Sequence, residues 1–344
     1  MLVSVGGEVS EGILASLADC RDRLLIVGTT TDPTTRSARQ CDVIVQVAPS
    51  IDVASFVRDV AEALRVHRPI VAFPCRDADM PGLAKVKADD PVLGAPLLVG
   101  SVALANAMSD KVLMKGFMER CRLPIPATAW TFDGALELAG RYGFPLIAKP
   151  RVGSGTKGVY IVLDDEQLRS CALHGDFVIQ PFISPPPDFV ANLPDPRFGV
   201  PFVQSSGFTA LIALRGLVGR DGRLDHVVKV DVVHRYGRPF RLTRCPVDAV
   251  DHEAAQRVAA ELHCEGYVGP FALQGRVDDN GALVFFEMLA RIGGSALGFV
   301  GLGLNQSRIV LEMFGGPAAV ASKVTADSVE WQTIPRAFDD RVVS

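Results

Sequence analysis

The stretch Pro145-Leu-Ile-Ala-Lys-Pro-Arg-Val-Gly-Ser-Gly-Thr-Lys-Gly158 joins a short apolar run, closed by a lysine, to a glycine-rich segment. A lysine at the end of a buried strand suits a polyphosphate, because its ammonium attracts phosphate oxygens and side-chain-poor backbone can close over them. The pattern is not the G-x-x-x-x-G-K-[ST] loop, since no helix directly follows that lysine. Taken alone, the stretch is equally well interpreted as a surface hairpin with solvated lysines.

A compact alternation of strands and helices surrounds this stretch. Each element is predicted from an apolar run bounded by turn residues. A further helix is expected to begin after Ser109-Asp110, which can cap it, and to end before the prolines that follow Leu123. The β-α-β-β-α-β order is predicted as strands 127–131, 145–149, 159–162 and 177–182 with helices 134–142 and 164–172.

Two polar residues on a predicted hairpin form a second cluster. Gln274 and Glu287 both lie about six or seven residues from the centre of the turn Asp278-Asp-Asn-Gly281, so they are expected to be near neighbours across antiparallel strands. Their oxygens suit Mg²⁺, which prefers hard ligands and keeps waters or phosphate oxygens for the rest. A Gln–Glu or Glu–Arg pair on an exposed sheet face is the alternative. Because Glu287 follows the apolar run Leu283–Phe286, where an unpaired carboxylate is costly, the pattern favours a functional site.

The last strand of the β-α-β-β-α-β unit, Val178-Ile-Gln-Pro-Phe-Ile183, leads toward the next domain. Such a crossover can hydrogen-bond an adenine edge through its backbone and Gln180. By itself it is only the end of a buried strand.

Together these clusters resemble the ATP-grasp superfamily, in particular its carbamoyl-phosphate-synthetase-like carboxylate–amine ligases. The resemblance covers about residues 1–316 and implies an α/β protein, α+β in its ATP-binding part, with three lobes and an N-terminal Rossmann-like domain. The matching motifs are Ser109-Asp-Lys111, Cys121–Thr128, Pro145–Pro150, Gly153–Val159, Gly269–Gln274 and Phe285-Phe-Glu-Met-Leu-Ala-Arg291.

The resemblance implies a role for each matching residue, with ATP and Mg²⁺ as the cofactors. Gln274 and Glu287 would ligate the metal. Lys149 and Arg291 would be catalytic, stabilising the phosphate in transfer. The residues expected around the ATP phosphates are Lys111, Lys149, Gly153, Ser154, Gly155, Lys157 and Gly158. Those expected around adenine and ribose are Gln180, Pro181, Phe182 (through its backbone) and Asp188. Those expected beside the carboxylate substrate are Arg291, Gly293, Gly294 and Ser295.

One position departs from the family pattern. The signature has asparagine two residues after the glutamate, and this chain has Leu289. Leucine cannot ligate Mg²⁺. Three interpretations stay open: water or substrate replaces the lost oxygen, the protein holds a single metal, or catalysis is impaired.

The resemblance implies an ATP-dependent ligase. A carboxylate attacks the γ-phosphate of ATP, an amine displaces phosphate from the acyl-phosphate, and ADP and phosphate are released. An amino acid is the expected small substrate, by analogy of fold alone. Two other classes compete: an ATP-binding module, catalytically impaired, with a regulatory or scaffolding role, and an NAD-binding protein. The spacing of Gly6, Gly7 and Gly12 lacks the G-x-G-x-x-G fingerprint that NAD binding needs.

The N-terminal region alternates apolar runs with amphipathic stretches, which predicts a parallel sheet with covering helices. The runs are Leu2–Val5, Leu24–Val27, Val43–Val47 and Ile70–Phe73, with a helix over Val53–Leu64. The expected division of the chain is 1–98 (Rossmann-like), 99–182 (small ATP-binding subdomain), 183–318 (central domain with the metal and substrate site) and 319–344 (tail). Arg215 and Lys229 are second-rank candidates for the ATP cleft, on strands of the central domain.

The composition of the chain limits the classes of partner and the cell compartment that are expected. The 344 residues carry a net charge of −4, which argues against a generic nucleic-acid surface, and 48% are hydrophobic, enough for a sizeable core. Seven cysteines without a C-x-x-C pair indicate reduced thiols and a cytoplasmic protein. The uncharged stretch 91–109 is broken by proline and glycine, so no membrane span is expected. The expected partners are a small-molecule carboxylate and an amine, and the resemblance implies a homodimer.

Overall fold

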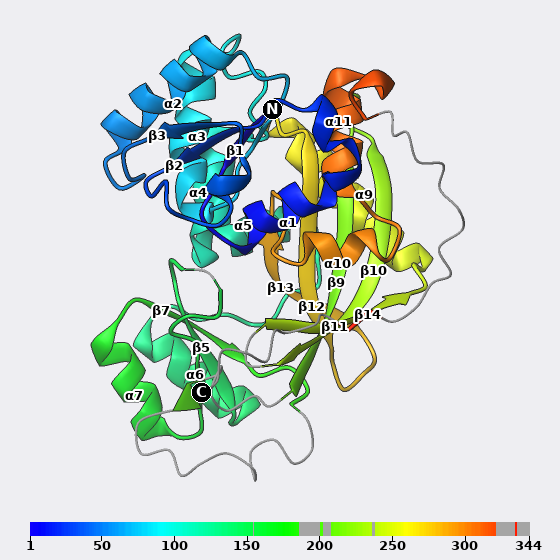
Figure 1. Cartoon of the computed structure of the whole chain (residues 1–344). Helices are drawn as coiled ribbons and strands as arrows, with labels where there is room; N and C mark the ends of the chain where they lie inside the picture. Colours follow the sequence, from blue (N-terminus) through cyan, green and yellow to red (C-terminus); the bar gives the residue numbers. More distant parts are fainter. Residues whose placement is uncertain (154, 186–199, 202–207, 236–237, 321–333, 336–344) are drawn as a thin grey trace, which may run out of the picture.

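The computed structural model describes residues 1–153, 155–185, 200–201, 208–235, 238–320 and 334–335. Three sheets organise the chain, and Figure 1 shows the N-terminal sheet, the long central strands and the small lobe as separate layers. Ser154 and Asp188, two of the expected ATP contacts, lie outside the described residues.

The N-terminal lobe is the expected parallel sheet with helices on its faces. Its strands, in the order β3-β2-β1-β4, are all parallel. Successive β1 residues enter different cores: Leu2 packs with α2 and α3, and Val3 packs with α1 and α11. The bounds are β1 Leu2–Ser4, α1 Glu8–Ser16, η1 Ala18–Arg23, β2 Val27–Thr30, η2 Ala38–Gln40, β3 Val43–Gln46, α2 Val53–His67, β4 Ala72–Phe73, η3 Asp77–Asp79 and α3 Met80–Asp89.

The second strand begins later than its apolar run predicts. The run starts at Leu24, but the Leu24 N–H donates to Arg21 O at 3.2 Å and closes the 3-10 turn before the strand. The side chain of Leu25 is 60% exposed. Pairing with β1 therefore starts only at Val27, opposite Leu2.

The small lobe is an antiparallel sheet in the order β7-β5-β6-β8, with two helices. The predicted strand at 127–131 is wrong: it makes one isolated bridge, between Ala129 and Ile179. Thr128 turns back to donate to Pro126 O, and Thr131 already caps α6, which leaves no room for a strand. The bounds are α6 Phe132–Tyr142, β5 Leu146–Pro150, β6 Tyr160–Val162, α7 Asp165–His174, β7 Phe177–Pro181 and β8 Val200–Pro201.

The central sheet is antiparallel throughout, in the order β13-β12-β9-β10-β11-β14. The predicted hairpin at Asp278–Gly281 is present in it, and a second hairpin joins β9 to β10. Gly281 and Gly222 lie in the left-handed region at these two turns. The bounds are β9 Phe208–Val218, β10 Leu224–Arg235, β11 Arg238–Cys245, α9 Ala249–Cys264, β12 Gly269–Val277, β13 Leu283–Leu289, α10 Ala296–Val300, α11 Gln306–Gly315, η4 Pro317–Ala319 and β14 Ile334–Pro335.

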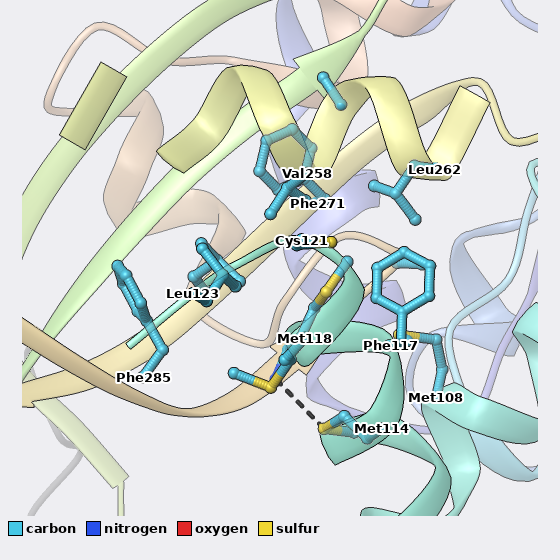
Figure 2. Close-up of a cluster of buried hydrophobic side chains, with 14 of the residues drawn as sticks. Met108, Met114, Phe117, Met118, Cys121, Leu123, Val258, Leu262, Phe271 and Phe285 are labelled. Carbon is cyan, nitrogen blue, oxygen red and sulfur yellow. Dashed lines mark hydrogen bonds between the residues drawn. The ribbon is translucent and has the colours of Figure 1, made fainter. Parts of the chain in front are cut away.

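Two helices link the N-terminal lobe to the rest, α4 (Val102–Ser109) and α5 (Lys111–Arg120). They share one buried core with α9 and the central sheet, and Figure 2 shows Met108, Met114 and Phe117 packing toward Val258 and Leu262. This core fixes α5 against β13. In the described ranges, no helix has both the length and the apolar composition to span a bilayer.

Candidate functional site

A pocket lies between the small lobe and the central sheet. It encloses about 1060 Å³ of space, part of it open to solvent. Ten of the residues singled out from sequence line it: Lys111, Lys149, Gly153, Gly155, Lys157, Gln180, Pro181, Phe182, Gln274 and Glu287. Residues more than 170 positions apart in the chain, such as Lys111 and Glu287, therefore line one pocket.

Lys149 is the penultimate residue of β5, and side chains of both lobes contact it. Its Nζ donates to Gln180 Oε1 at 2.9 Å, and the Gln180 amide donates in turn to Thr128 Oγ1 at 3.1 Å. The ammonium also lies 4.5 Å from the centre of the Phe286 ring, on β13. Desolvation is the main reason that the pKa of Lys149 is lowered to about 8, with Glu287 opposing the shift and Lys111 adding to it.

Lys111 is the first residue of α5 and is positioned by its neighbours. Asp110 caps the helix by accepting from the N–H groups of Val112 and Leu113, and it forms an ion pair with Arg151 at 2.8 Å. Lys111 Nζ donates to Gly153 O at 3.0 Å, so it lies over the glycine-rich hairpin. Burial lowers the pKa of Lys111, and the charge of Glu287 opposes that shift.

The glycine-rich hairpin requires glycine at defined positions. Gly155 and Gly158 have φ of +68° and +70°, in the left-handed region. A Cβ at Gly158 would also meet Pro150 Cγ at 3.0 Å. Gly158 supports the hairpin but is not among the residues that line the pocket.

Gln274 and Glu287 lie directly opposite each other on the two strands of the hairpin, as expected. Gln274 on β12 is the register partner of Glu287 on β13, so the two side chains share one face of the sheet. The register shifts directly after Gln274, so Glu287 stands beside a β-bulge at the rim of the pocket. Among the described residues, no group of three His, Cys, Asp or Glu side chains gathers to hold a metal. The chain itself therefore offers two oxygen-bearing side chains here, which suits an Mg²⁺ that takes its other ligands from phosphate and water.

Several pocket residues were missed from the sequence. The Arg276 guanidinium lies 4.9 Å from the centre of the Phe182 ring and thus joins the central sheet to the small lobe. Burial lowers its pKa to about 10. The Phe182 N–H donates to Pro145 O at 3.2 Å, so the expected backbone contact of Phe182 with the nucleotide must use another group. Ile183, the next residue, also lines the pocket. A basic residue two positions after Gln274, on the same face, is the signal that a period-two reading of β12 would have found.

Arg291 and the glycines that follow it do not line this pocket. The Arg291 guanidinium is 9% exposed and makes two hydrogen bonds to Asp77, at 2.6 and 2.5 Å. Desolvation opposes its charge, yet the hydrogen bonds and charge of Asp77 raise the pKa of Arg291. Asp77 follows β4, so this pair ties the N-terminal lobe to the end of β13.

We expect Asp77→Asn to lower the free energy of unfolding by about 3–5 kcal/mol, because it leaves the buried Arg291 charge without its partner. The matched control is Asp89→Asn, which breaks the exposed Lys85–Asp89 pair and should cost less than about 1 kcal/mol. Urea denaturation of both variants measures the difference. Equal losses in the two variants would contradict a structural role for the Asp77–Arg291 pair.

Gly293 and Ser295 contact a second buried arginine instead. Arg215 on β9 donates to Ser295 Oγ at 2.8 Å, and a Cβ at Gly293 would lie 2.6 Å from its Nη2. The other second-rank candidate, Lys229, forms an ion pair with Asp251 of α9 at 2.8 Å and has a structural role there.

Comparisons with known proteins agree with this architecture. No family model matches the chain. Over 79 residues it is 30% identical to the carbamoyl phosphate synthase large chain of Lachnoclostridium phytofermentans, a match that spans 22% of this chain and 7% of that protein.

Solved structures match nearly the whole chain. A biotin carboxylase–β,γ-ATP complex from Campylobacter jejuni is 16% identical with a TM-score of 0.63, over 94% of this chain and 71% of that one. An N5-carboxyaminoimidazole synthetase from Staphylococcus aureus complexed with ADP is 12% identical with a TM-score of 0.65, over 96% and 79%. An L-amino acid ligase from Bacillus licheniformis is 16% identical with a TM-score of 0.63, over 93% and 77%. The expected architecture is confirmed: this chain has the fold of the ATP-grasp carboxylate–amine ligases.

Proposed function

We propose that this protein is an ATP-dependent carboxylate–amine ligase that forms an amide or peptide bond on a small substrate and releases ADP and phosphate. One observation carries the proposal: Gln274 and Glu287 form a direct cross-strand pair on the wall of a pocket that also holds Lys111 and Lys149. A bound nucleoside triphosphate requires lysines and a metal ion that neutralise its phosphate charges, and these four residues can supply both. The β,γ-ATP and ADP complexes of two solved relatives support the same choice of nucleotide.

The proposed reaction has two steps. A carboxylate oxygen of the substrate attacks the γ-phosphorus, the bond from that phosphorus to the β–γ bridging oxygen breaks, and ADP leaves. The amine nitrogen then attacks the acyl carbon, the bond to phosphate breaks, and the amine gives up a proton. Lys149 and Lys111 hold the phosphates, while Gln274 and Glu287 would hold Mg²⁺, which supplies neutralisation of phosphate charge when bound. The Gly153–Gly158 hairpin would close over the phosphates.

The predicted substrate is an amino acid, and the homodimer expected from the resemblance stays a prediction. The relative from Bacillus licheniformis is an L-amino acid ligase, which supports the substrate class. A second candidate function, an ATP-binding module without turnover, is favoured by Leu289. Its buried side chain lies opposite Ala272, where the family signature has asparagine.

The test is a screen for phosphate release from Mg·ATP in the presence of the proteinogenic amino acids, singly and in pairs, with Glu287→Ala as the inactive control. Release of ADP that requires a carboxylate and an amine, and that disappears in the variant, would support the ligase. Nucleotide binding without any turnover across the screen would favour the module. AMP as the product would contradict an acyl-phosphate route.

Nucleotide affinity should depend on pH through Lys149. The polyphosphate favours the charged ammonium, and the pKa of about 8 in the free protein means that the lysine is charged below that pH. Affinity for MgADP should therefore be level below pH 8 and fall as pH rises above it, by up to about tenfold per pH unit. Binding at pH 9 should take up close to one proton, measured by calorimetry in buffers of different ionisation enthalpy.

The matched variant for this measurement is Lys149→Arg, whose guanidinium stays charged over the same range. It should bind MgADP with little proton uptake at pH 9. Identical uptake by both proteins would assign the titration to another group and contradict the role of Lys149.

A further inference from the structure

Arg215 is the most deeply buried cation beside the expected substrate residues. Its side chain is 3% exposed and lies with its guanidinium 3.8 Å from the centre of the Phe299 ring. Its hydrogen-bond acceptors are neutral: Ser295 Oγ at 2.8 Å and Gln306 Oε1 at 3.5 Å. Its Nε finds no acceptor among the described residues.

The charges in this region do not balance. Arg291 is neutralised by Asp77, to which it donates two hydrogen bonds, whereas Arg215 forms no ion pair in the part of the chain that the structure describes. Burial, and then the repulsion from Arg291, lower the pKa of Arg215 to about 9. A buried charge without a counter-ion destabilises the fold, and proteins keep such violations mostly at functional sites. An anionic ligand would supply the missing charge.

The sheet register places this charge next to the expected metal pair. Ala213, Gln274 and Glu287 form one cross-strand row, and Arg215, Ala272 and Leu289 form the next row on the same face. Adjacent rows are about 7 Å apart along the strands. Ala272 and Leu289 are small or apolar, so they neither pair with the guanidinium nor screen it.

The segment Gly293–Ser295 lies against Arg215. Gly293 has no side chain, and a Cβ there would overlap the guanidinium. On this segment a charge of opposite sign is also near, because Glu8 Oε2 would lie 3.7 Å from a Cβ at Gly294. Among the contacts of this segment, the cation that lacks a counter-ion in the described residues is Arg215, which would attract the carboxylate of the proposed amino-acid substrate.

We propose that Arg215 is a positioning residue whose buried charge, acting through Gly293–Ser295, holds the carboxylate of an α-amino acid one row from the metal pair. This inference rests on the proposed function and assigns the substrate's anionic group to Arg215, because Arg291 is already neutralised by Asp77.

The test compares wild type with Arg215→Met, Arg215→Lys and the control Arg220→Met in the full chain. Arg220 is also an arginine stacked on a phenylalanine ring, 4.7 Å from the centre of Phe314, but it is exposed. MgADP binding is first measured by calorimetry for all four proteins. Melting temperatures of the MgADP-loaded proteins are then followed against glycine, as a fragment common to α-amino acids, and against glycinamide, which keeps the ammonium but lacks the carboxylate.

All four proteins should bind MgADP alike, and glycine but not glycinamide should stabilise wild type. Arg215→Met should need at least about tenfold more glycine, because the attraction between two opposite charges in a partly buried site contributes at least this much. Arg215→Lys should keep part of the response, and Arg220→Met all of it. Without ligand, Arg215→Met should melt no lower than wild type, because it removes an unpaired buried charge.

Two results would overturn the proposal while leaving nucleotide binding intact. One is an equal glycine response in wild type and Arg215→Met. The other is a lower melting temperature of unliganded Arg215→Met, with no glycine response in wild type, which would make Arg215 purely structural. Failure of wild type to bind MgADP would instead refute the proposed function, and this inference with it.

Discussion

Glu287→Gln should lower amine- and carboxylate-dependent ADP formation by at least about 100-fold, the scale seen when one group that stabilises transition-state charge is removed. Glutamine keeps the shape and one oxygen but loses the negative charge that faces Lys149 and Lys111. Mg²⁺ would then be held by two neutral amides. Raising the Mg²⁺ concentration should therefore recover part of the lost rate, as measured by coupled ADP assay.

A second measurement separates metal binding from misfolding. Without Mg²⁺, Glu287 repels the phosphates, so the variant should bind metal-free ADP at least as tightly as wild type. Glu253→Gln serves as the control, because Glu253 forms an exposed pair with Arg257 on α9. A Glu287→Gln protein with wild-type rates at ordinary Mg²⁺ would place the metal site elsewhere.

Lys149→Met should lower kcat/KM for ATP by about 100-fold, which corresponds to about 2.7 kcal/mol of lost transition-state stabilisation. Methionine keeps the apolar stem against the Phe286 ring but removes the ammonium. The affected groups are the phosphates, so ADP affinity should fall while adenosine affinity stays unchanged. Calorimetry with both ligands gives this comparison.

The control for the lysine is Lys85→Met, which removes an exposed pair with Asp89 in the N-terminal lobe. It should leave ADP binding unaltered. If Lys149→Met weakened adenosine and ADP equally, the lysine would act on the closure of the two lobes and not on phosphate.

Much of the site could be predicted because, in a hairpin, the number of residues between a side chain and the turn determines which residue it faces on the partner strand. The Asp278–Gly281 turn fixes the register that sets Gln274 opposite Glu287, and both residues can be counted from it. Lys149 could also be predicted from the local sequence, because a lysine near the end of an apolar run is a recognisable pattern. The strand at 127–131 was wrong because local capping by Thr131 competes with strand pairing.

Other features depend on contacts that no local pattern reveals. Asp77 neutralises Arg291 from 214 residues away, so the sequence alone could not show that this arginine is already paired. The same holds for Arg215. Only the structure shows that it contacts Ser295 and Gln306 and has no counter-ion among the described residues. The contact between Arg276 and Phe182 also joins two lobes, although the position of Arg276 on the face of Gln274 could be read from the alternation along β12.

In the proposed reaction, a substrate carboxylate attacks the γ-phosphate of ATP in this pocket. The most direct test is turnover of the carboxylate identified by the screen, labelled with ¹⁸O in both oxygens, followed by mass spectrometry of the released phosphate. Transfer of one ¹⁸O into phosphate in each turnover is the predicted result. Unlabelled phosphate, or ¹⁸O recovered in AMP, would contradict it.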